Sequence, residues 1–212
     1  MTTFIFVRHG ESETNKTREF AGQANPALTE KGLQQAEQQA QWLAANFSVD
    51  YIYSSDLVRA CQTAGAFAKR TGRVIIKNAS FREINGGNWQ EKTYTYIQEN
   101  YPEEFHIWTN DMANAKLPNG ETVKELATRV VDEMFRLKEV HRNKTIAVFT
   151  HATPIRLLVA FLKTGSLDSV NQTPWCSNAS TTVIQFDGNK VMFQLLSYDD
   201  YLEEKTYLPG II

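Results

Sequence analysis

Cysteine is scarce in this chain, which has only two, Cys61 and Cys176, among 212 residues. Two thiols this far apart in sequence cannot form the disulfide framework of a small secreted domain. The chain also lacks the CxxC and cysteine–histidine spacings that are typical of metal sites. We therefore expect two free, buried thiols in a reducing compartment, and neither a bound metal nor another cofactor.

Long apolar runs and a basic excess are also missing. The longest apolar run in a helical context, residues 157–162, is far too short to cross a bilayer. The formal net charge of −2 disfavours nonspecific binding to nucleic acid. The first residues lack the basic start, apolar segment and cleavage site of a secretory signal. We expect a cytoplasmic protein without nucleic-acid or membrane partners.

The chain does contain an alternation of short β-prone runs and amphipathic segments. Strands are predicted at residues 3–7 (TFIFV), 51–54 (YIYS), 74–77 and 145–150 (TIAVFT). Helices are predicted to begin at Thr29, at Ser55 or Asp56, at Thr122 and near Pro154. Residues 181–186 and 191–196, separated by Asp-Gly-Asn, predict a β-hairpin.

This alternation indicates one three-layer α/β/α domain over residues 1–212, with a mostly parallel sheet. The terminal hairpin would add an antiparallel edge strand. Residues 80–120 carry many aromatics, and we expect a small insertion of helices and loops over the site. The insertion would either contact the substrate as a cap or simply cover the core. In such sheets, ligands bind beyond the carboxyl ends of the strands.

Histidines follow two of the predicted strands, His9 after the first and His151 after TIAVFT. Arg8 stands beside His9, Arg59 lies about one helical turn into the helix after the second strand, and Glu83 follows the third strand. Each residue alone is weak evidence, because isolated charged groups are mostly solvated and single histidines are mostly structural. Their joint placement at one edge predicts a site for an anionic ligand.

The sequence also contains blocks that resemble, in order, the motifs of the histidine phosphatase superfamily, which includes the cofactor-dependent phosphoglycerate mutases. The blocks are VRHGE at residues 7–11, SSDLVRACQTA at 54–64, FREINGGNW at 81–89 and FTHA at 149–152. The resemblance extends from residue 3 to about residue 186. Three features depart from the family pattern. Ala152 stands where glycine is usual, the WEG ending of the third block reads WQE, and the tail SYDDYLEE matches no motif.

The resemblance implies a metal-independent phosphatase acting on a small phosphorylated metabolite through a phosphohistidine on His9. Arg8, Arg59 and His151 would bind the phosphoryl oxygens. Glu83 would protonate the leaving oxygen and then take a proton from the attacking water. Asn15, the backbone near Gly22 and Gln23, and Ala152 would complete the phosphate site. The arginines would lower the pKa of His9 and a bound phosphate would raise it, so the sequence leaves the balance open.

Other functions are compatible with parts of this pattern. A phosphoglycerate mutase would use the same phosphohistidine, but such mutases carry a longer, more basic insertion, and here Glu83 and His151 are only 68 positions apart. A non-catalytic phosphoester-binding module would be expected to lose His9 or Glu83. A bimetallic hydrolase would need several carboxylates beside the histidines. Hydrolysis is therefore favoured, the substrate stays open, and a homodimer is one compatible assembly.

Overall fold

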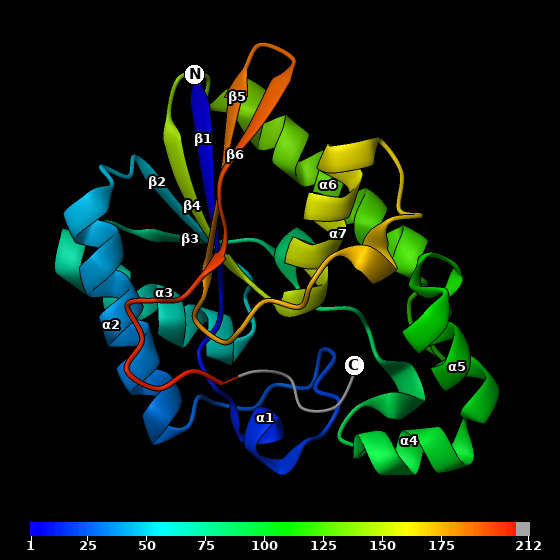
Figure 1. Ribbon diagram of the computed structural model, residues 1–212. Coiled ribbons are helices and arrows are strands. Elements are labelled where there is room, and N and C mark those ends of the chain that lie inside the picture. The colour runs from blue at the N-terminus through cyan, green and yellow to red at the C-terminus, as the bar shows by residue number, and fades with distance from the viewer. Residues whose placement is uncertain (207–212) are drawn as a thin grey trace.

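The computed structural model describes residues 1–206, and a six-stranded sheet with helices on both faces forms its centre (Figure 1). The strands are β1 (Thr2–Arg8), β2 (Tyr51–Ser54), β3 (Ile75–Lys77), β4 (Thr145–Thr150), β5 (Thr181–Asp187) and β6 (Lys190–Tyr198). They lie in the order β3-β2-β4-β1-β5-β6. Strands β1 to β4 are parallel to one another. Strand β5 pairs antiparallel with β1, and β6 pairs antiparallel with β5. The predicted α/β fold is confirmed, and its antiparallel edge comprises both strands of the hairpin.

Alternate residues of the central strands face opposite helical layers. Phe4 and Phe6 of β1 pack in one core with helices α6 (Val123–Val140) and α7 (Ala152–Thr164). Ile5 and Val7 pack in a second core with α2 (Glu30–Asn46) and α3 (Val58–Thr71). Because both faces are covered, β1 is buried at every position, and this explains its unbroken apolar run.

The helix starts agree with the sequence patterns except at α3. The side chain of Thr29 caps α2 by accepting from the N–H of Gly32 (3.0 Å). The cap expected at Ser55 or Asp56 is wrong, since α3 has Leu57 at its N-cap. Asp56 instead pairs with Arg82 (2.5 Å), and the Ser55 hydroxyl lies 2.8 Å from His151 Nε2. Both side chains therefore serve tertiary contacts that local sequence cannot reveal.

The segment between β3 and α6 consists of short helices and loops. It contains the helical turns η1 (Ala79–Phe81), η2 (Gly87–Trp89) and η3 (Met112–Asn114) and the helices α4 (Tyr94–Asn100) and α5 (Pro102–Asn110). Figure 1 shows α4 and α5 on the same side of the molecule as α1 (Glu13–Thr17), beyond the carboxyl end of β1. Trp89 and Trp108 are buried in the core, so this insertion is anchored to the domain.

The segment after α7 connects the second helical layer to the antiparallel edge and then returns to the site. It forms the turn η4 (Val170–Gln172) before the hairpin. After β6, the chain reaches Thr206, whose hydroxyl donates to Glu11 Oε2 (3.0 Å) near the end of β1. Among residues 1–206, no helix is long and apolar enough to span a membrane.

Candidate phosphoryl-transfer site

His9 is held at the end of β1 by backbone and side-chain contacts. Its N–H donates to Thr150 O (3.0 Å), which continues the pairing of β1 with β4 by one residue. Its ring Nδ1 lies 2.7 Å from Gly10 O. A carbonyl oxygen only accepts, so Nδ1 carries the proton and Nε2 has the lone pair. Arg59 Nε donates to Nε2 at 3.2 Å, in agreement with this tautomer.

The surroundings of His9 also decide its charge. Burial lowers its pKa well below the ordinary value, and the positive charges of Arg59 and Arg8 lower it further. The imidazole is therefore neutral at neutral pH. Desolvation and the two arginines act on its pKa in the same direction.

Arg8 and Arg59 place two guanidinium groups beside His9. Their exposed fractions are 1% and 0%, and neither forms an ion pair within the described part of the chain. Arg8 Nη1 donates to Cys176 O (2.5 Å), while its Nε has no partner there. Arg59 donates to the carbonyls of Ala24 and Gly22 (both 2.8 Å). Burial lowers the pKa of Arg59 to about 10. Buried cations without a direct ion pair indicate a site for an anion.

His151 follows β4 and lies against His9, with ring centroids 5.1 Å apart. It is completely buried, behind the residues that form the pocket wall. Its Nε2 lies 2.8 Å from Ser55 Oγ, and its Nδ1 has no hydrogen-bond partner among residues 1–206. Burial lowers the pKa of His151 well below its usual value, with Arg59 and His9 adding to the effect. This second histidine is therefore also neutral.

Glu83 lies opposite His9 on the loop that follows η1. Its carboxylate accepts from the N–H of Ile84 (2.8 Å) and from the N–H of Thr153 (3.3 Å) at the start of α7. The backbone of the loop is held by Arg129 of α6, which donates to the carbonyls of Ser80, Arg82 and Glu83 (2.8, 2.8 and 2.9 Å). The acid/base candidate is therefore positioned from two different helices.

Asn15 of α1 lies in the pocket wall, as the resemblance implies. Its Oδ1 accepts from the N–H of Ser12 (3.1 Å) and from Asn178 Nδ2 (3.0 Å). These two bonds use the carbonyl end of the side-chain amide. The NH₂ end of Asn15 makes no hydrogen bond within the portion that the structure describes, so it is available to donate to a ligand.

Of the remaining predicted phosphate-site residues, two line the pocket and one does not. Gly22 and Ala152 line the pocket. Gly22 has φ +50°, a conformation suited to glycine, and its carbonyl accepts from Arg59. Gln23 is not among the pocket-lining residues, and its expected role at the phosphate stays a prediction. Its N–H already donates to Gln90 Oε1 (2.8 Å), and its side chain donates to Glu83 O (3.2 Å). Gln23 therefore supports the acid/base loop.

The phosphate pocket has a volume of about 40 Å³, and it borders a cleft of about 1010 Å³. Tyr94, Trp108 and Trp175 line both. Tyr94 and Trp108 belong to the aromatic insertion. Trp108 is buried in the core and also lines the cavity, so the insertion covers the core, and its contact with substrate stays a prediction. The sequence patterns missed Trp175 and Thr153. Only the helix start after His151 could have pointed to Thr153. No local signal marks Trp175.

A metal would need a cluster of suitable ligands. Among residues 1–206, no group of three or more His, Cys, Asp and Glu side chains is arranged to hold one. The charged groups that meet at the pocket are the two guanidinium groups of Arg8 and Arg59 and the carboxyl groups of Glu19 and Glu83.

Comparison with known proteins agrees with this geometry. The model of the histidine phosphatase superfamily (branch 1) matches residues 4–199. Phosphoserine phosphatase 1 of Hydrogenobacter thermophilus is 31% identical over 207 residues, which cover 96% of each chain. Phosphoglycerate mutase-like protein 4 of Arabidopsis thaliana is 29% identical over 207 residues, covering 96% of this chain and 88% of that protein. The solved structure of Bacillus stearothermophilus YhfR has a TM-score of 0.86 at 29% identity, covering 95% and 99% of the chains.

This chain belongs to the histidine phosphatase superfamily. The expected enzyme class, a phosphoric monoester hydrolase, is confirmed at the level of phosphatase and phosphoryl-transfer chemistry.

Proposed function

We propose that this protein hydrolyses small phosphomonoesters without a metal, through a phosphohistidine on His9. One observation carries the proposal: a neutral imidazole, whose Nε2 lone pair accepts only from Arg59 Nε, lies beside two buried guanidinium groups that form no direct ion pair within residues 1–206. The lone pair supplies a nucleophile, and the cations supply binding energy for a phosphoryl group. The pocket of about 40 Å³ is suited to that group alone.

The reaction follows from these groups in two steps. His9 Nε2 forms a bond to phosphorus while the ester P–O bond breaks, and the leaving oxygen takes a proton from protonated Glu83. A water molecule then attacks the phosphohistidine and gives a proton to Glu83. The P–N bond breaks, and orthophosphate is released. Substrate binding would draw Arg59 Nε from His9 Nε2 to a phosphoryl oxygen, which frees the lone pair. Arg8, Asn15 and His151 Nδ1 would donate to the other oxygens.

Metal independence rests on the charges at the site. Phosphoryl transfer needs positive charge near the oxygens, and Arg8 and Arg59 supply it in fixed positions. The two arginines therefore take the role that a metal has in other phosphatases.

Hydrolysis is favoured over mutase activity by the adjoining cleft. A mutase must hold a phosphorylated acceptor through cations on the far side of the phosphate pocket. Arg156 is the buried cation there, and it donates to Thr173 O (2.6 Å), Asn171 O (3.3 Å) and Met112 Sδ (3.1 Å). These hydrogen bonds within the protein occupy the guanidinium of Arg156. The wide cleft also gives water a route to the phosphohistidine.

The test is phosphate release from p-nitrophenyl phosphate and a panel of phosphomonoesters that includes 3-phosphoglycerate, with a chelator present. We expect release by the wild type and a loss of about a thousandfold or more in His9→Ala. His106→Ala is the matched control, since His106 is exposed on α5. Release that persists in His9→Ala, or that the chelator abolishes, would overturn the proposal. Isomerisation of 3-phosphoglycerate without release would assign a mutase instead.

A further inference from the structure

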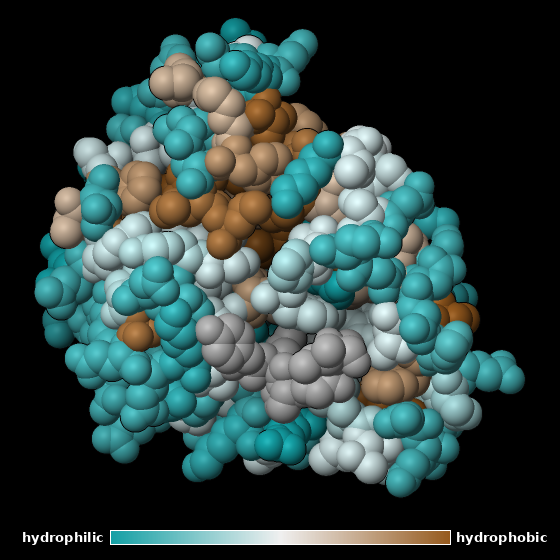
Figure 2. Space-filling view, in the orientation of Figure 1, coloured by the Kyte–Doolittle hydropathy of each residue, from teal (hydrophilic) through white to brown (hydrophobic). Residues whose placement is uncertain are grey.

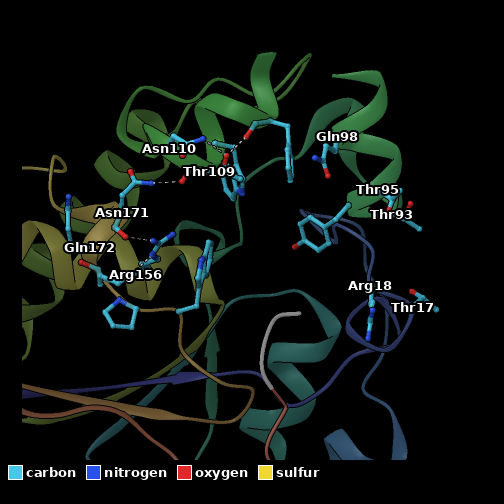
Figure 3. A pocket seen from close by; sticks show the side chains of 16 residues that line it. Thr17, Arg18, Thr93, Thr95, Gln98, Thr109, Asn110, Arg156, Asn171 and Gln172 are labelled. Carbon is cyan, nitrogen blue, oxygen red and sulfur yellow. Dashed lines mark hydrogen bonds between the residues drawn. The ribbon is translucent and has the colours of Figure 1, made fainter. Parts of the chain in front are cut away.

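The cleft of about 1010 Å³ shares three lining residues with the phosphate pocket, so the two spaces adjoin. Figure 3 shows the side chains that line the cleft. One side is formed by the end of α1 and by α4, with Arg18 and Gln98, and the other by α5, α7 and the segment around η4, with Asn110 and Gln172. At the shared boundary, Tyr94, Trp108 and Trp175 face both spaces. The group esterified to a bound phosphoryl would therefore enter this cleft.

Aromatic side chains form the inner part of the cleft. They are Tyr94, Phe105, Trp108 and Trp175. Trp108 and Trp175 lie with ring centroids 6.4 Å apart. The guanidinium of Arg156 lies 4.2 Å from the ring centroid of Trp175, and its three hydrogen bonds hold it there. Trp175 is thus a rigid wall, and rigid aromatic walls favour a ligand that presents a flat or ring-shaped apolar face.

Free hydrogen-bonding groups surround this aromatic part. The side-chain amides of Gln98 and Gln172 make no hydrogen bonds within the described residues, and Figure 3 shows them on opposite sides of the cleft. By contrast, the Asn171 amide is used, because it donates to Thr109 O (2.8 Å) and accepts from the N–H of Met112 (3.0 Å). Free amides can both donate to and accept from hydroxyl groups.

The charges of the cleft select against cationic leaving groups. Its described lining contains Arg18 and Arg156 and no aspartate or glutamate. The acidic side chains nearby, Glu19 and Glu83, line the phosphate pocket instead. An ammonium group in the cleft would lose its hydration without gaining a counterion.

We infer that the leaving group is a ring that carries hydroxyl groups and no ammonium group, as in a sugar phosphate or a nucleoside monophosphate. The inference rests on the proposed phosphatase function and extends it to the substrate class. The ring stacks against the tryptophan wall, and its hydroxyls bind Gln98 and Gln172.

The wild-type test compares kcat/KM for four primary alkyl phosphates, whose leaving alcohols have similar reactivity: glucose 6-phosphate, uridine 5′-monophosphate, O-phosphoserine and phosphoethanolamine. We expect at least one ring ester to exceed both ammonium-bearing esters by about tenfold or more. The ranking of the two ring esters separates sugar from nucleoside recognition. Equal or higher kcat/KM for phosphoserine or phosphoethanolamine would overturn the inference.

A variant test locates the effect in the cleft. In Gln98→Ala/Gln172→Ala, we expect the ratio of ring ester to phosphoserine kcat/KM to fall by about tenfold, because two hydrogen bonds are lost. Both side chains are exposed, so folding is preserved, and Gln34→Ala on the exposed face of α2 is the matched control. An unchanged ratio would overturn the placement. Failure of the proposed phosphatase function would give a different result from failure of this inference. In that case no ester would release phosphate, or His9→Ala would stay active.

Discussion

The hydroxyl of Ser55 determines which ring nitrogen of His151 carries a proton. Ser55 Oγ accepts from the N–H of Leu57 (3.3 Å), so its own proton is free to point at His151 Nε2, 2.8 Å away. With Nε2 accepting, the proton of the neutral ring lies on Nδ1. That nitrogen has no partner among the described residues, and it is the donor that the proposed function requires.

Removing this hydroxyl gives a prediction at the residue scale. We expect Ser55→Ala to lower kcat/KM by about tenfold and to release the tautomer preference of His151. Nitrogen-15 NMR of the histidine rings measures the tautomer directly. A spectrum in which His151 keeps its Nδ1–H form in the variant would contradict the assignment. His9 serves as the internal control, because its tautomer depends on Gly10 O.

At the scale of elements, α6 positions the loop that carries Glu83 through one arginine. Arg129 makes three hydrogen bonds to carbonyls of the loop and two to Glu121 (2.7 and 3.0 Å). This use depends on the planar fork of a guanidinium, which a lysine ammonium cannot reproduce. The helix therefore contributes to the site without contacting the pocket.

Arg129→Lys should reduce kcat by about tenfold or more with a smaller change in KM, because Glu83 is misplaced while the phosphate-binding arginines remain. Steady-state kinetics on a single ester measures both constants. Arg136→Lys, on the exposed part of the same helix, should leave them unchanged. Equal losses in the two variants would show that the effect is not specific to the loop.

The turn after β1 depends on close contact with the start of α2. A Cβ on Gly10 would lie 2.4 Å from Gly32 O, which is backbone and cannot move aside easily. Gly65 in α3 has open space around it. The same substitution should therefore have opposite effects at the two positions.

We expect Gly10→Ala to lower the free energy of unfolding by about 1–3 kcal/mol, as overpacking does. Gly65→Ala should raise it by about 0.5–1 kcal/mol, because alanine loses less backbone entropy in a helix. Denaturant unfolding of both variants beside the wild type measures these changes. A neutral Gly10→Ala would mean that the turn tolerates a methyl group.

At the scale of the whole molecule, the site carries a stability cost at acidic pH. His9 and His151 come from neighbouring strands and are both buried, with pKa values well below the ordinary 6.5. The unfolded chain binds protons at these histidines near pH 6.5, and the folded chain does not. Stability therefore rises with pH through this range and is lost as pH falls below about 6.5.

From pH 7 to pH 5.5, each buried histidine should remove about 1 kcal/mol from the free energy of unfolding. The decline should therefore be about 1 kcal/mol smaller in His9→Gln than in the wild type. Gln34→Ala, at an exposed position of α2 that does not titrate, should keep the full decline. Denaturant titrations of each protein at the two pH values measure the decline in the free energy of unfolding. Identical declines in wild type and His9→Gln would contradict the lowered pKa.

The assembly state stays a prediction. Figure 2 shows a mostly hydrophilic surface with a hydrophobic area in the upper part of the molecule, where Figure 1 places β5 and β6. Leu196 of β6 is 45% exposed. The molar mass in solution would show whether the protein forms the homodimer that the sequence allows.

The sequence alone determined the parts of this protein that depend on local chemistry. Strand runs such as TFIFV and the cap at Thr29 reflect interactions within a few residues, so they can be read directly. Arg8, His9, Arg59, Glu83 and His151 could be named in advance because they stand in short motifs at strand ends. The parallel-sheet rule then predicted that they meet at one edge.

Only the tertiary structure decided which groups touch. Ser55 was expected as a helix cap and instead contacts His151, 96 positions away. Gln23 donates to the backbone carbonyl of Glu83, 60 positions away, and Trp175 lines the cleft without any local signal. The charge of His9 also depends on burial and on Arg59, 50 positions away. Each of these outcomes depends on distances between segments far apart in the chain, which the packing of the two helical layers sets and no local pattern records.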